Sequence, residues 1–572
     1  MLKVQPKETQ SMWTRDGVRL DADVYRPDAP GTFPVLLMRQ PYGRAIASTV
    51  VYAHPAWYAA HGYIVVIQDV RGRGTSQGEF RLFESEIADG YDAVNWAATL
   101  SGSSGAVGMY GFSYQGMTQL YAAVEKPIAL QTICPAMMGY DLYSDWAYEG
   151  GAFCLQANLG WAIQLQAETA RLQGDESAFL SLSQAAKTLP LDDRIPARPQ
   201  IMSELAQKSF YHDWLDRPPI DSYWRRLSPK TYIENFDLPM LHIGGWFDPY
   251  LRGNFNLYQA MVDRGQHPQH LIVGAWAHLP WGRKVGPVDY GETAVSFCDR
   301  AQIRWFDQFL KGIDTGLLHE PPVQLFEMGS NQWRSFPRFP VAHQQSFFLS
   351  SSGLAGMDDR DGKLTPIPNS HPSTPDLLVH DPWRPVPALG GHAAAPSGSY
   401  ERSALEARSD ILTYTSARLT AALHLAGSVT LEIDCTADTA TFDLSAVLSE
   451  VRPEGGVYNF TQGYVRVESS AEKPVKVALQ PTCMQLSAGS ALRLSLSGAC
   501  FPAYPVNGGN GTPPGIARAI DAKIITLTIR SGATRPLDCF CLPGKALPRL
   551  LRQSGDLFRR MKLYWMQFSS WF

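Results

Sequence analysis

Apolar and polar residues alternate along the first part of the chain in a way that predicts buried strands separated by helices. Two apolar runs, 32–43 (TFPVLLMRQPYG) and 62–74 (GYIVVIQDVRGRG), end in polar, glycine-rich turns, as expected of strands buried on both faces of a parallel sheet. Between them, 55–62 (PAWYAAHG) predicts a helix, and 84–100 predicts another with its apolar residues near one face. Residues 18–140 are therefore expected to form an α/β sheet with helices on both sides.

This alternation stops after residue 140 and resumes later. Three segments, 155–174, 176–189 and 192–210, have helical periodicity, and no strand is predicted among them. The strand and helix pattern then returns between 238 and 312. The sequence thus predicts a discontinuous α/β domain, residues 1–140 and 229–315, interrupted by a helical cap at residues 141–228.

The pattern changes again after about residue 315. Short β-rich runs punctuated by proline, glycine and serine follow, from 322–329 (PVQLFEMG) to 523–532 (KIITLTIRSG). Many strands separated by turns are typical of an antiparallel jelly roll, which we predict for residues 316–546. The tail, 547–572, places large apolar residues along one helical stripe with arginines off it. Such a tail suits contact with a membrane surface, with a second copy in a homodimer, or with its own jelly roll.

Composition limits the functions that these domains can have. The chain has 572 residues, too many for one core, and 45% hydrophobic residues exclude global disorder. Its formal net charge of −4 offers no basic field for nucleic acid and favours a small-molecule partner. No segment has the pattern of a signal peptide or a membrane span, so a cytoplasmic protein is expected. The cysteines are scattered, and the close pair Cys539 and Cys541 lacks a second pair at zinc-site spacing, so no metal is expected.

The first candidate for chemistry is Ser113, in the sequence GFSYQG at 111–116. In a G-x-S-x-G motif between a strand and a helix, the chain turns so sharply that the serine is exposed at the apex of the turn. Only small residues fit two positions before and after it. An apolar run precedes Ser113 and a helix-like segment follows it, which is the context that the motif requires. An ordinary serine in a glycine-rich loop is the alternative, and the partners of Ser113 must decide between the two.

Two further reactive side chains follow predicted strands. Asp248 comes directly after MLHIGGWF, and His278 comes directly after LIVGAWA. In doubly wound sheets, active groups lie beyond the carboxyl ends of strands. Taken singly, Asp248 could be a turn residue and His278 a core histidine. The order Ser113, Asp248, His278 is nevertheless that of an α/β-hydrolase triad, in which the histidine accepts the serine proton and the carboxylate orients the ring.

An acyl transfer at Ser113 would also need hydrogen-bond donors for the oxyanion of its tetrahedral intermediate. The backbone N–H of Tyr114, the residue after the nucleophile, is one donor. The second is expected from the turn after an earlier strand, here RQPYGR. That turn lacks the glycine run of many lipases, and the group available in it is the Tyr42 hydroxyl.

Several long blocks resemble those of the CocE/NonD hydrolases, among them FPVLLMRQPYGR, VVIQDVRGRGTSQGEF, GMYGFSYQG, LHIGGWFDPY and VGAWAH. The resemblance extends over about residues 10–543, and this family is similar to X-Pro dipeptidyl-peptidases and α-amino-acid ester hydrolases. It implies an α/β-hydrolase domain with an inserted helical cap and a C-terminal β jelly roll. It further implies that the triad is Ser113, Asp248 and His278, and that the Tyr42 hydroxyl joins the Tyr114 amide in the oxyanion hole.

The resemblance also bears on the substrate. In cocaine-esterase-like members, aromatic groups from the cap and from the loop after the catalytic acid line the acyl pocket. Trp161 and Tyr250 look like the matching residues, with core packing as the alternative for both. Members that recognise a free α-amino group use acidic side chains near the site, whereas no acid follows Asp248 here. Arg252 either attracts a substrate carboxylate or faces solvent.

We therefore expect a serine hydrolase that cleaves a small-molecule carboxylic ester or amide through an acyl-enzyme, without a metal or organic cofactor. One alternative is a peptidase of the X-Pro dipeptidyl type. The other, from a different class, is a carbohydrate-binding protein that keeps an inactive hydrolase domain, and the complete triad argues against it.

Overall fold

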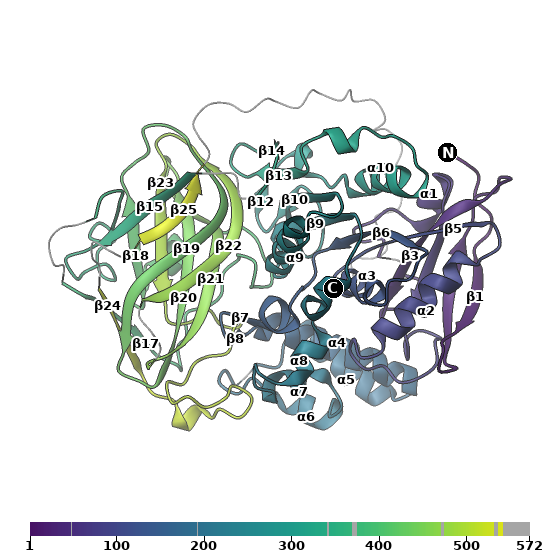
Figure 1. The fold of residues 1–572 in the computed structure, drawn as a ribbon. Coiled ribbons are helices and arrows are strands. Elements are labelled where there is room, and N and C mark those ends of the chain that lie inside the picture. Colours follow the sequence, from purple (N-terminus) through teal and green to yellow (C-terminus); the bar gives the residue numbers. More distant parts are fainter. Residues whose placement is uncertain are drawn as a thin grey trace.

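The computed structural model describes residues 1–46, 48–191, 193–339, 343–368, 374–470, 474–530 and 536–541, so the predicted tail at 547–572 lies outside the described residues. A ten-stranded sheet dominates the first part of the chain (Figure 1). Its central strands, from β4 to β13, run parallel, and antiparallel strands close both edges. In spatial order the strands are β1 (Glu8–Trp13), β2 (Arg19–Tyr25), β4 (Ile64–Asp69), β3 (Phe33–Gln40), β5 (Ser103–Phe112), β6 (Leu130–Ala136), β9 (Met240–Phe247), β10 (Gln269–Ala277), β13 (Val323–Glu327) and β14 (Gln332–Phe336).

Helices cover both faces of this sheet, as the continuous apolar runs predict. Val35 and Leu37 of β3 share a core with α2 and α3, whereas Leu36 and Met38 share one with α1 and α10. Successive side chains of a strand point to opposite faces, so a strand buried on both faces must be apolar throughout. The helices are α1 (Pro55–Ala60), α2 (Glu86–Ala98), α3 (Tyr114–Val124), α9 (Leu251–Arg264) and α10 (Cys298–Leu310).

The sheet extends further along the chain than the sequence predicted. The sequence pattern places 322–329 in the jelly roll, but in the structure this segment contains β13, which pairs in parallel with β10. The strand β14 then pairs with β13 and ends the sheet. A short apolar run has the same pattern in either domain, so periodicity cannot show which sheet it joins.

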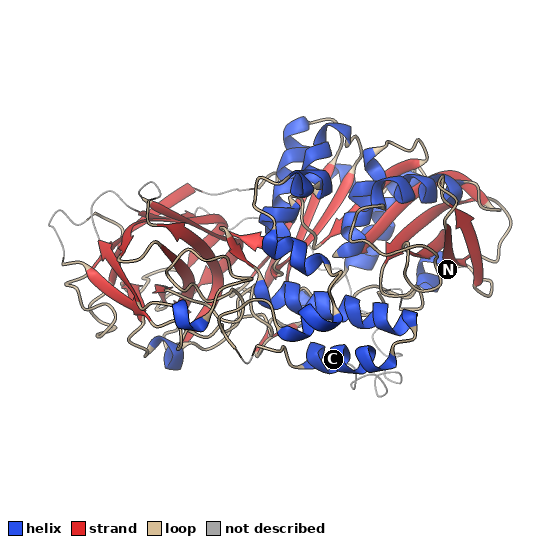
Figure 2. Ribbon diagram, turned by 90° about the horizontal axis from the view of Figure 1, so that it is seen from below, coloured by secondary structure: helices blue, strands red, loops and turns tan. Residues whose placement is uncertain are grey.

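A cap lies between β6 and β9 and consists mainly of helices, which are labelled in Figure 1 and drawn in blue in Figure 2. It also contains a short hairpin that was not predicted, built on Gly150 and Gly151. Both glycines have positive φ, and a Cβ on Gly150 would lie 2.1 Å from the carbonyl oxygen of Tyr464, so only glycine fits this contact with the jelly roll. The elements are the π-helix η1 (Leu142–Ala147), β7 (Tyr148–Glu149), β8 (Ala152–Phe153), α4 (Leu155–Gln173), α5 (Glu176–Lys187), α6 (Gln200–Leu205), α7 (Phe210–Asp216), α8 (Ser222–Leu227) and the 3₁₀-helix η2 (Pro229–Asn235).

The C-terminal part is a separate β-rich domain with an eleven-stranded sheet. One apolar cluster joins Phe255 of α9 and Phe326 of β13 to Leu479 of β22, so this domain and the first sheet share a core. Its strands are β15 (His343–Ser350), β16 (Lys363–Thr365), β17 (Asp376–His380), β18 (Ile411–Ser416), β19 (Leu423–Ala437), β20 (Thr441–Val451), β21 (Val457–Glu468), β22 (Val475–Leu486), β23 (Ala491–Ser497), β24 (Ile525–Arg530) and β25 (Pro536–Cys541). Smaller elements are β11 (Lys284–Val285), β12 (Val288–Asp289), η3 (Glu292–Ala294), η4 (Leu317–His319), α11 (Ser403–Glu406) and η5 (Ala519–Asp521).

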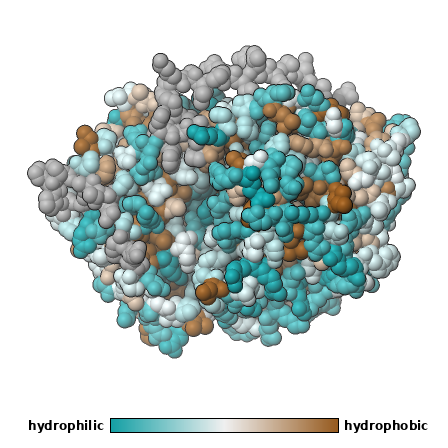
Figure 3. Space-filling model, in the orientation of Figure 1, coloured by the Kyte–Doolittle hydropathy of each residue, from teal (hydrophilic) through white to brown (hydrophobic). Residues whose placement is uncertain are grey.

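The face of the molecule seen in Figure 1 is largely hydrophilic, with apolar residues scattered among polar ones (Figure 3). Within the described part of the chain, no helix combines the length and apolarity needed to cross a membrane.

Candidate active site

Ser113 stands at a sharp turn between β5 and α3. Its backbone has φ +61° and ψ −126°, a conformation that residues other than glycine rarely adopt. A Cβ on Gly111 would lie 2.4 Å from Cβ of Gln115, and one on Gly116 would lie 2.8 Å from the carbonyl oxygen of Ala136. Both glycines of the motif are therefore required by close packing, and the turn has the geometry expected of a nucleophile elbow.

Asp248 and His278 lie together at the same edge of the sheet. Each follows the end of a strand, β9 and β10 respectively, and these strands run parallel to β5. The His278 Nδ1–H donates a hydrogen bond of 2.7 Å to Oδ1 of Asp248, whose side chain is fully buried. The ring of Phe112, which precedes Ser113, lies 5.3 Å from the His278 ring between centroids. Because the carboxylate accepts this bond, the proton of the neutral ring is on Nδ1. The other ring nitrogen, Nε2, can then accept a proton.

The turn that carries Asp248 is held from the C-terminal domain. Gln480 of β22, itself buried, donates hydrogen bonds of 3.1 Å to the backbone carbonyl oxygens of Trp246 and of Asp248. The Trp246 indole N–H donates to the carbonyl oxygen of Phe326 at 2.7 Å. Sequence reasoning missed Gln480 because it is 232 residues from Asp248 and belongs to no motif.

Tyr42 lies in the turn after β3, next to β5, with its hydroxyl within hydrogen-bonding reach of the Ser113 side chain. The Trp161 indole N–H donates to the Tyr42 hydroxyl oxygen at 3.2 Å. Because an indole N–H can only donate, the tyrosine proton remains free to donate elsewhere. Burial raises the pKa of Tyr42 to about 12, so the hydroxyl stays protonated at neutral pH. Tyr114 begins α3, and its N–H is among the first amides of that helix, which lack intrahelical acceptors.

Buried ion pairs fix the turn that carries Tyr42. The backbone N–H of Arg44 and its guanidinium both bond to Asp69 at 2.5 Å, and the guanidinium also bonds to Asp23 at 2.9 Å. The Gln40 side chain donates to the carbonyl oxygen of Gly43 at 3.0 Å. Contacts on both sides of Tyr42 therefore limit the movement of its backbone.

An aromatic cluster adjoins His278. Trp161 and Tyr250 are both in it, but they are bridged by Trp146 of η1, which is buried. The Trp146 ring lies 5.3 Å from that of Trp161 and 4.3 Å from that of Tyr250, and the Tyr250 ring lies 5.1 Å from that of His278. Sequence reasoning missed Trp146, whose only signal was the aromatic-rich segment at the start of the cap.

Arg252 neither faces solvent nor carries an unmatched charge. Its side chain is 17% exposed and pairs with Glu149 of β7 at 2.8 Å. The Glu149 carboxylate also accepts hydrogen bonds from His392 Nε2, at 2.9 Å, and from the Tyr504 hydroxyl. Despite burial, these partners hold the pKa of Glu149 down at about 2. The charge of Arg252 is thus matched by a carboxylate of the protein itself.

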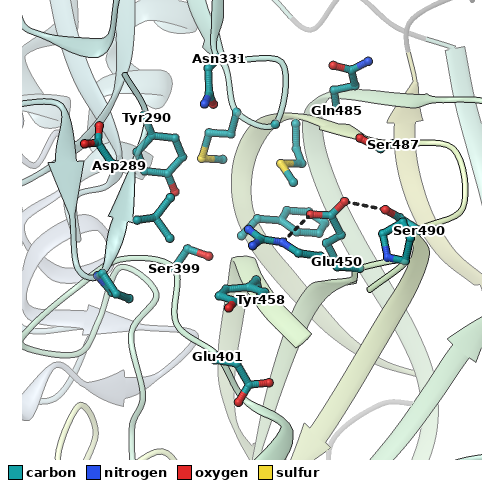
Figure 4. A pocket seen from close by; sticks show the side chains of 18 of the residues that line it. Asp289, Tyr290, Asn331, Ser399, Glu401, Glu450, Tyr458, Gln485, Ser487 and Ser490 are labelled. Carbon is teal, nitrogen blue, oxygen red and sulfur yellow. Dashed lines mark hydrogen bonds and ion pairs between the residues drawn. The ribbon is translucent and has the colours of Figure 1, made fainter. Parts of the chain in front are cut away.

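A separate cavity of about 660 Å³ lies between the β11–β12 hairpin and the jelly roll (Figure 4). Ser113, Asp248 and His278 are not among its lining residues. Most of its charged side chains are already partnered. Glu450, for example, accepts a hydrogen bond from Ser490 at 2.7 Å and pairs with Arg452 at 3.5 Å, as the dashed lines in Figure 4 show. This cavity is therefore distinct from the candidate active site.

A parallel sheet covered by helices, with an elbow serine and an acid–histidine pair at its carboxyl edge, is typical of serine hydrolases of the α/β class. Residues 16–280 match the family described as X-Pro dipeptidyl-peptidase (S15 family). Residues 315–535 match the X-Pro dipeptidyl-peptidase C-terminal non-catalytic domain. Over both of its main parts the chain is therefore similar to serine hydrolases, among them esterases and X-Pro dipeptidyl-peptidase-like enzymes.

Individual relatives show the same similarity. The chain is 29% identical over 532 residues to cocaine esterase of Rhodococcus sp. (strain MB1 Bresler). This alignment covers 87% of the present chain and 91% of the esterase. Its fold is similar to that of an aminopeptidase from a Thaumarchaeota archaeon, with a TM-score of 0.78 and 21% identity, covering 94% of this chain and 96% of the other. It is also similar to an α-amino acid ester hydrolase, with a TM-score of 0.76, 20% identity and the same coverage.

Proposed function

We propose that the chain hydrolyses carboxylic esters or activated amides through an acyl-enzyme on Ser113, with His278 as general base and acid and Asp248 as the carboxylate that orients it. The observation that carries this proposal is the 2.7 Å hydrogen bond between His278 and buried Asp248, at the sheet edge where Ser113 occupies its strained turn. A buried carboxylate paired with a histidine stabilises the imidazolium that forms when the serine is deprotonated.

The reaction follows from these roles. Oγ of Ser113 attacks the substrate carbonyl carbon while its proton passes to Nε2 of His278. The oxygen of the tetrahedral intermediate accepts hydrogen bonds from the Tyr42 hydroxyl and the Tyr114 N–H. The intermediate collapses, and the alcohol or amine leaves with the proton from His278. Water, activated by the same histidine, then attacks the acyl-enzyme, releases the carboxylic acid and restores Ser113.

The surroundings of the triad favour an ester with an apolar acyl group. Trp161, which is half-buried and bonded to Tyr42, and Tyr250, whose ring packs against His278, place aromatic side chains beside the proposed catalytic groups. Aromatic surroundings suit an apolar group. A peptidase that binds a free amino terminus would need a carboxylate with an unmatched charge. Glu149 is committed to Arg252, His392 and Tyr504 instead.

Labelling with a fluorophosphonate probe tests the proposed nucleophile. We expect the wild type and the control Ser101→Ala, which changes an exposed serine, to be labelled, and Ser113→Ala to be unlabelled. The turnover of a p-nitrophenyl ester should fall roughly a millionfold in Ser113→Ala, as for other triad serines. Labelled Ser113→Ala, or an unlabelled wild type, would contradict the proposal.

The bond type is tested by comparing p-nitrophenyl esters of graded chain length with aminoacyl-prolyl anilides on the wild-type protein. We expect kcat/KM to be higher for the esters and to depend on the length of the acyl chain. A preference for the anilides would instead support a peptidase of the X-Pro dipeptidyl type.

A further inference from the structure

Arg73 is a fully buried arginine without an ionic partner among the described residues. It lies in the turn after β4, within the segment RGRG, and its exposed fraction is 0%. Its Nη1 donates to the carbonyl oxygen of Leu165 at 3.1 Å, and its guanidinium lies over the Phe80 ring, 3.7 Å from the centroid. Two further nitrogens, Nε and Nη2, are buried and make no hydrogen bond within the described structure. The charge is therefore desolvated but not neutralised.

Such a charge is costly to the fold. A buried charge is normally paired, because the lost hydration must be replaced by an opposite charge and by hydrogen bonds. The carboxylate that interacts electrostatically with Arg73 is that of Glu168. This carboxylate is already paired with Arg171 at 2.7 Å, so it is not a dedicated partner of Arg73. Burial lowers the pKa of Arg73 to about 10, which still leaves it charged at neutral pH. Features that reduce stability without compensation elsewhere are expected at functional sites.

The position of Arg73 relates it to the candidate oxyanion hole. Leu165, which accepts its hydrogen bond, is one helical turn after Trp161 on α4, and residues four apart lie on the same face of a helix. Trp161 in turn donates to the Tyr42 hydroxyl at 3.2 Å. Arg73 and Tyr42 thus contact α4 at residues one helical turn apart, Arg73 at a backbone carbonyl and Tyr42 at a side chain.

Electrostatics single out Tyr42 as the group through which Arg73 can act. The positive charge of Arg73 interacts electrostatically with both Tyr42 and Tyr114. Burial raises the pKa of Tyr42, and the charge of Arg73 opposes this rise. The Tyr114 hydroxyl is already bonded to Glu86 at 2.7 Å. The Tyr42 hydroxyl, in contrast, has its proton free to donate next to Ser113.

We propose that Arg73 is a positioning residue of the oxyanion hole, whose buried charge polarises the Tyr42 hydroxyl and strengthens its hydrogen bond to the oxyanion. This inference rests on the proposed function. The oxyanion carries a full negative charge only after Ser113 attacks, so the positive charge favours the transition state over the bound substrate. Low polarity around the guanidinium makes this effect larger than it would be in water. Tyr42 keeps its proton throughout, so no group-transfer step is added to the reaction.

A double-mutant cycle with Tyr42 tests this role. We would measure kcat and KM for a p-nitrophenyl ester with Arg73→Met and Arg73→Lys, each alone and combined with Tyr42→Phe. Arg73→Met is expected to lower kcat about tenfold with little change in KM, and to have almost no effect when Tyr42 is already phenylalanine. Arg73→Lys, which keeps the charge, should restore most of kcat. The control Arg81→Met removes an exposed arginine downstream of the same turn and should leave kcat unchanged.

Thermal unfolding of the same variants separates this role from a structural one. Removing an unpaired buried charge relieves its desolvation, so Arg73→Met should unfold at the same temperature as the wild type or a higher one. An equal loss of kcat in both Tyr42 backgrounds, or a wild-type kcat in Arg73→Met, would overturn the inference. If fluorophosphonate labelling still depends on Ser113, these two kinetic results would leave the proposed function intact and overturn only the role of Arg73. An active Ser113→Ala variant would overturn both the proposed function and the role of Arg73.

Discussion

At the scale of single residues, the hydroxyl of Tyr42 is the group whose role can be measured most directly. Tyr42→Phe removes one oxyanion donor, and with it the acceptor of the Trp161 indole N–H, while keeping the aromatic ring. The loss of one such donor typically costs about 3 kcal/mol of transition-state stabilisation, or roughly a hundredfold in kcat. KM should change little, because the donor bonds most strongly to the charged intermediate.

Steady-state kinetics with a p-nitrophenyl ester would check this prediction. Tyr232→Phe is a suitable control, because that hydroxyl bonds to the carbonyl oxygen of Arg226, outside the candidate site, at 3.0 Å. A kcat for Tyr42→Phe close to that of the wild type would mean that another group stabilises the oxyanion.

Ser113, Asp248 and His278 could be proposed as candidates from the sequence because each directly follows an apolar run, and parallel strands bring their carboxyl ends to one edge. Arg73 and Trp146 could not be named in the same way. Nothing in the sequence shows that the RGRG turn buries a guanidinium against α4, or that a tryptophan bridges Trp161 and Tyr250. These contacts depend on how the cap packs on the sheet.

At the scale of elements, β22 of the jelly roll is expected to affect catalysis although it carries no catalytic residue. Gln480→Leu would leave the carbonyl oxygens of Trp246 and Asp248 without the donor that holds the acid turn. A small displacement of a catalytic group can cost a large factor in rate, so we expect kcat to fall about tenfold or more with KM largely retained. Stability should fall by about 1–3 kcal/mol, the usual penalty for leaving buried polar groups unsatisfied.

Ester turnover and denaturant unfolding, measured on the same variant, would test this effect. Gln485→Leu is a control on the same strand, because it changes a half-buried side chain that lines the separate cavity. Unchanged kcat in Gln480→Leu would show that the acid turn keeps its position without the two Gln480 hydrogen bonds.

Element types were predicted better than the partners of each element. The helices α2 and α4 fall within 84–100 and 155–174, two segments whose periodicity indicates them. The strand β13 was expected in the jelly roll but pairs with β10, and the hairpin β7–β8 was not expected at all. The pattern of apolar residues along a strand shows which faces of that strand are buried. It does not show which other strand lies beside it in the sheet. A two-residue strand is also too short to produce a pattern.

At the scale of the whole molecule, Glu149 joins all three parts of the chain. It belongs to the cap, Arg252 to α9 of the α/β domain, and His392 and Tyr504 to the C-terminal region. Breaking a buried ion pair by removing one partner leaves the other charge unmatched, which typically costs about 3–5 kcal/mol. Glu149→Gln should therefore destabilise the protein strongly at pH 7.

The same carboxylate predicts a pH dependence of stability. In the folded protein its pKa is about 2, below its ordinary value of 4.5, so folding favours the ionised form. Its contribution to the free energy of unfolding is fully present above about pH 4.5 and is lost as the pH falls toward 2. Denaturant unfolding at pH 7 and pH 3 should show a smaller pH effect in Glu149→Gln than in the wild type. Glu432→Gln removes an exposed pair with Lys476 and should behave like the wild type, since such pairs contribute about 1 kcal/mol or less. An equal pH effect in Glu149→Gln and the wild type would show that the ionised form of Glu149 does not stabilise the fold.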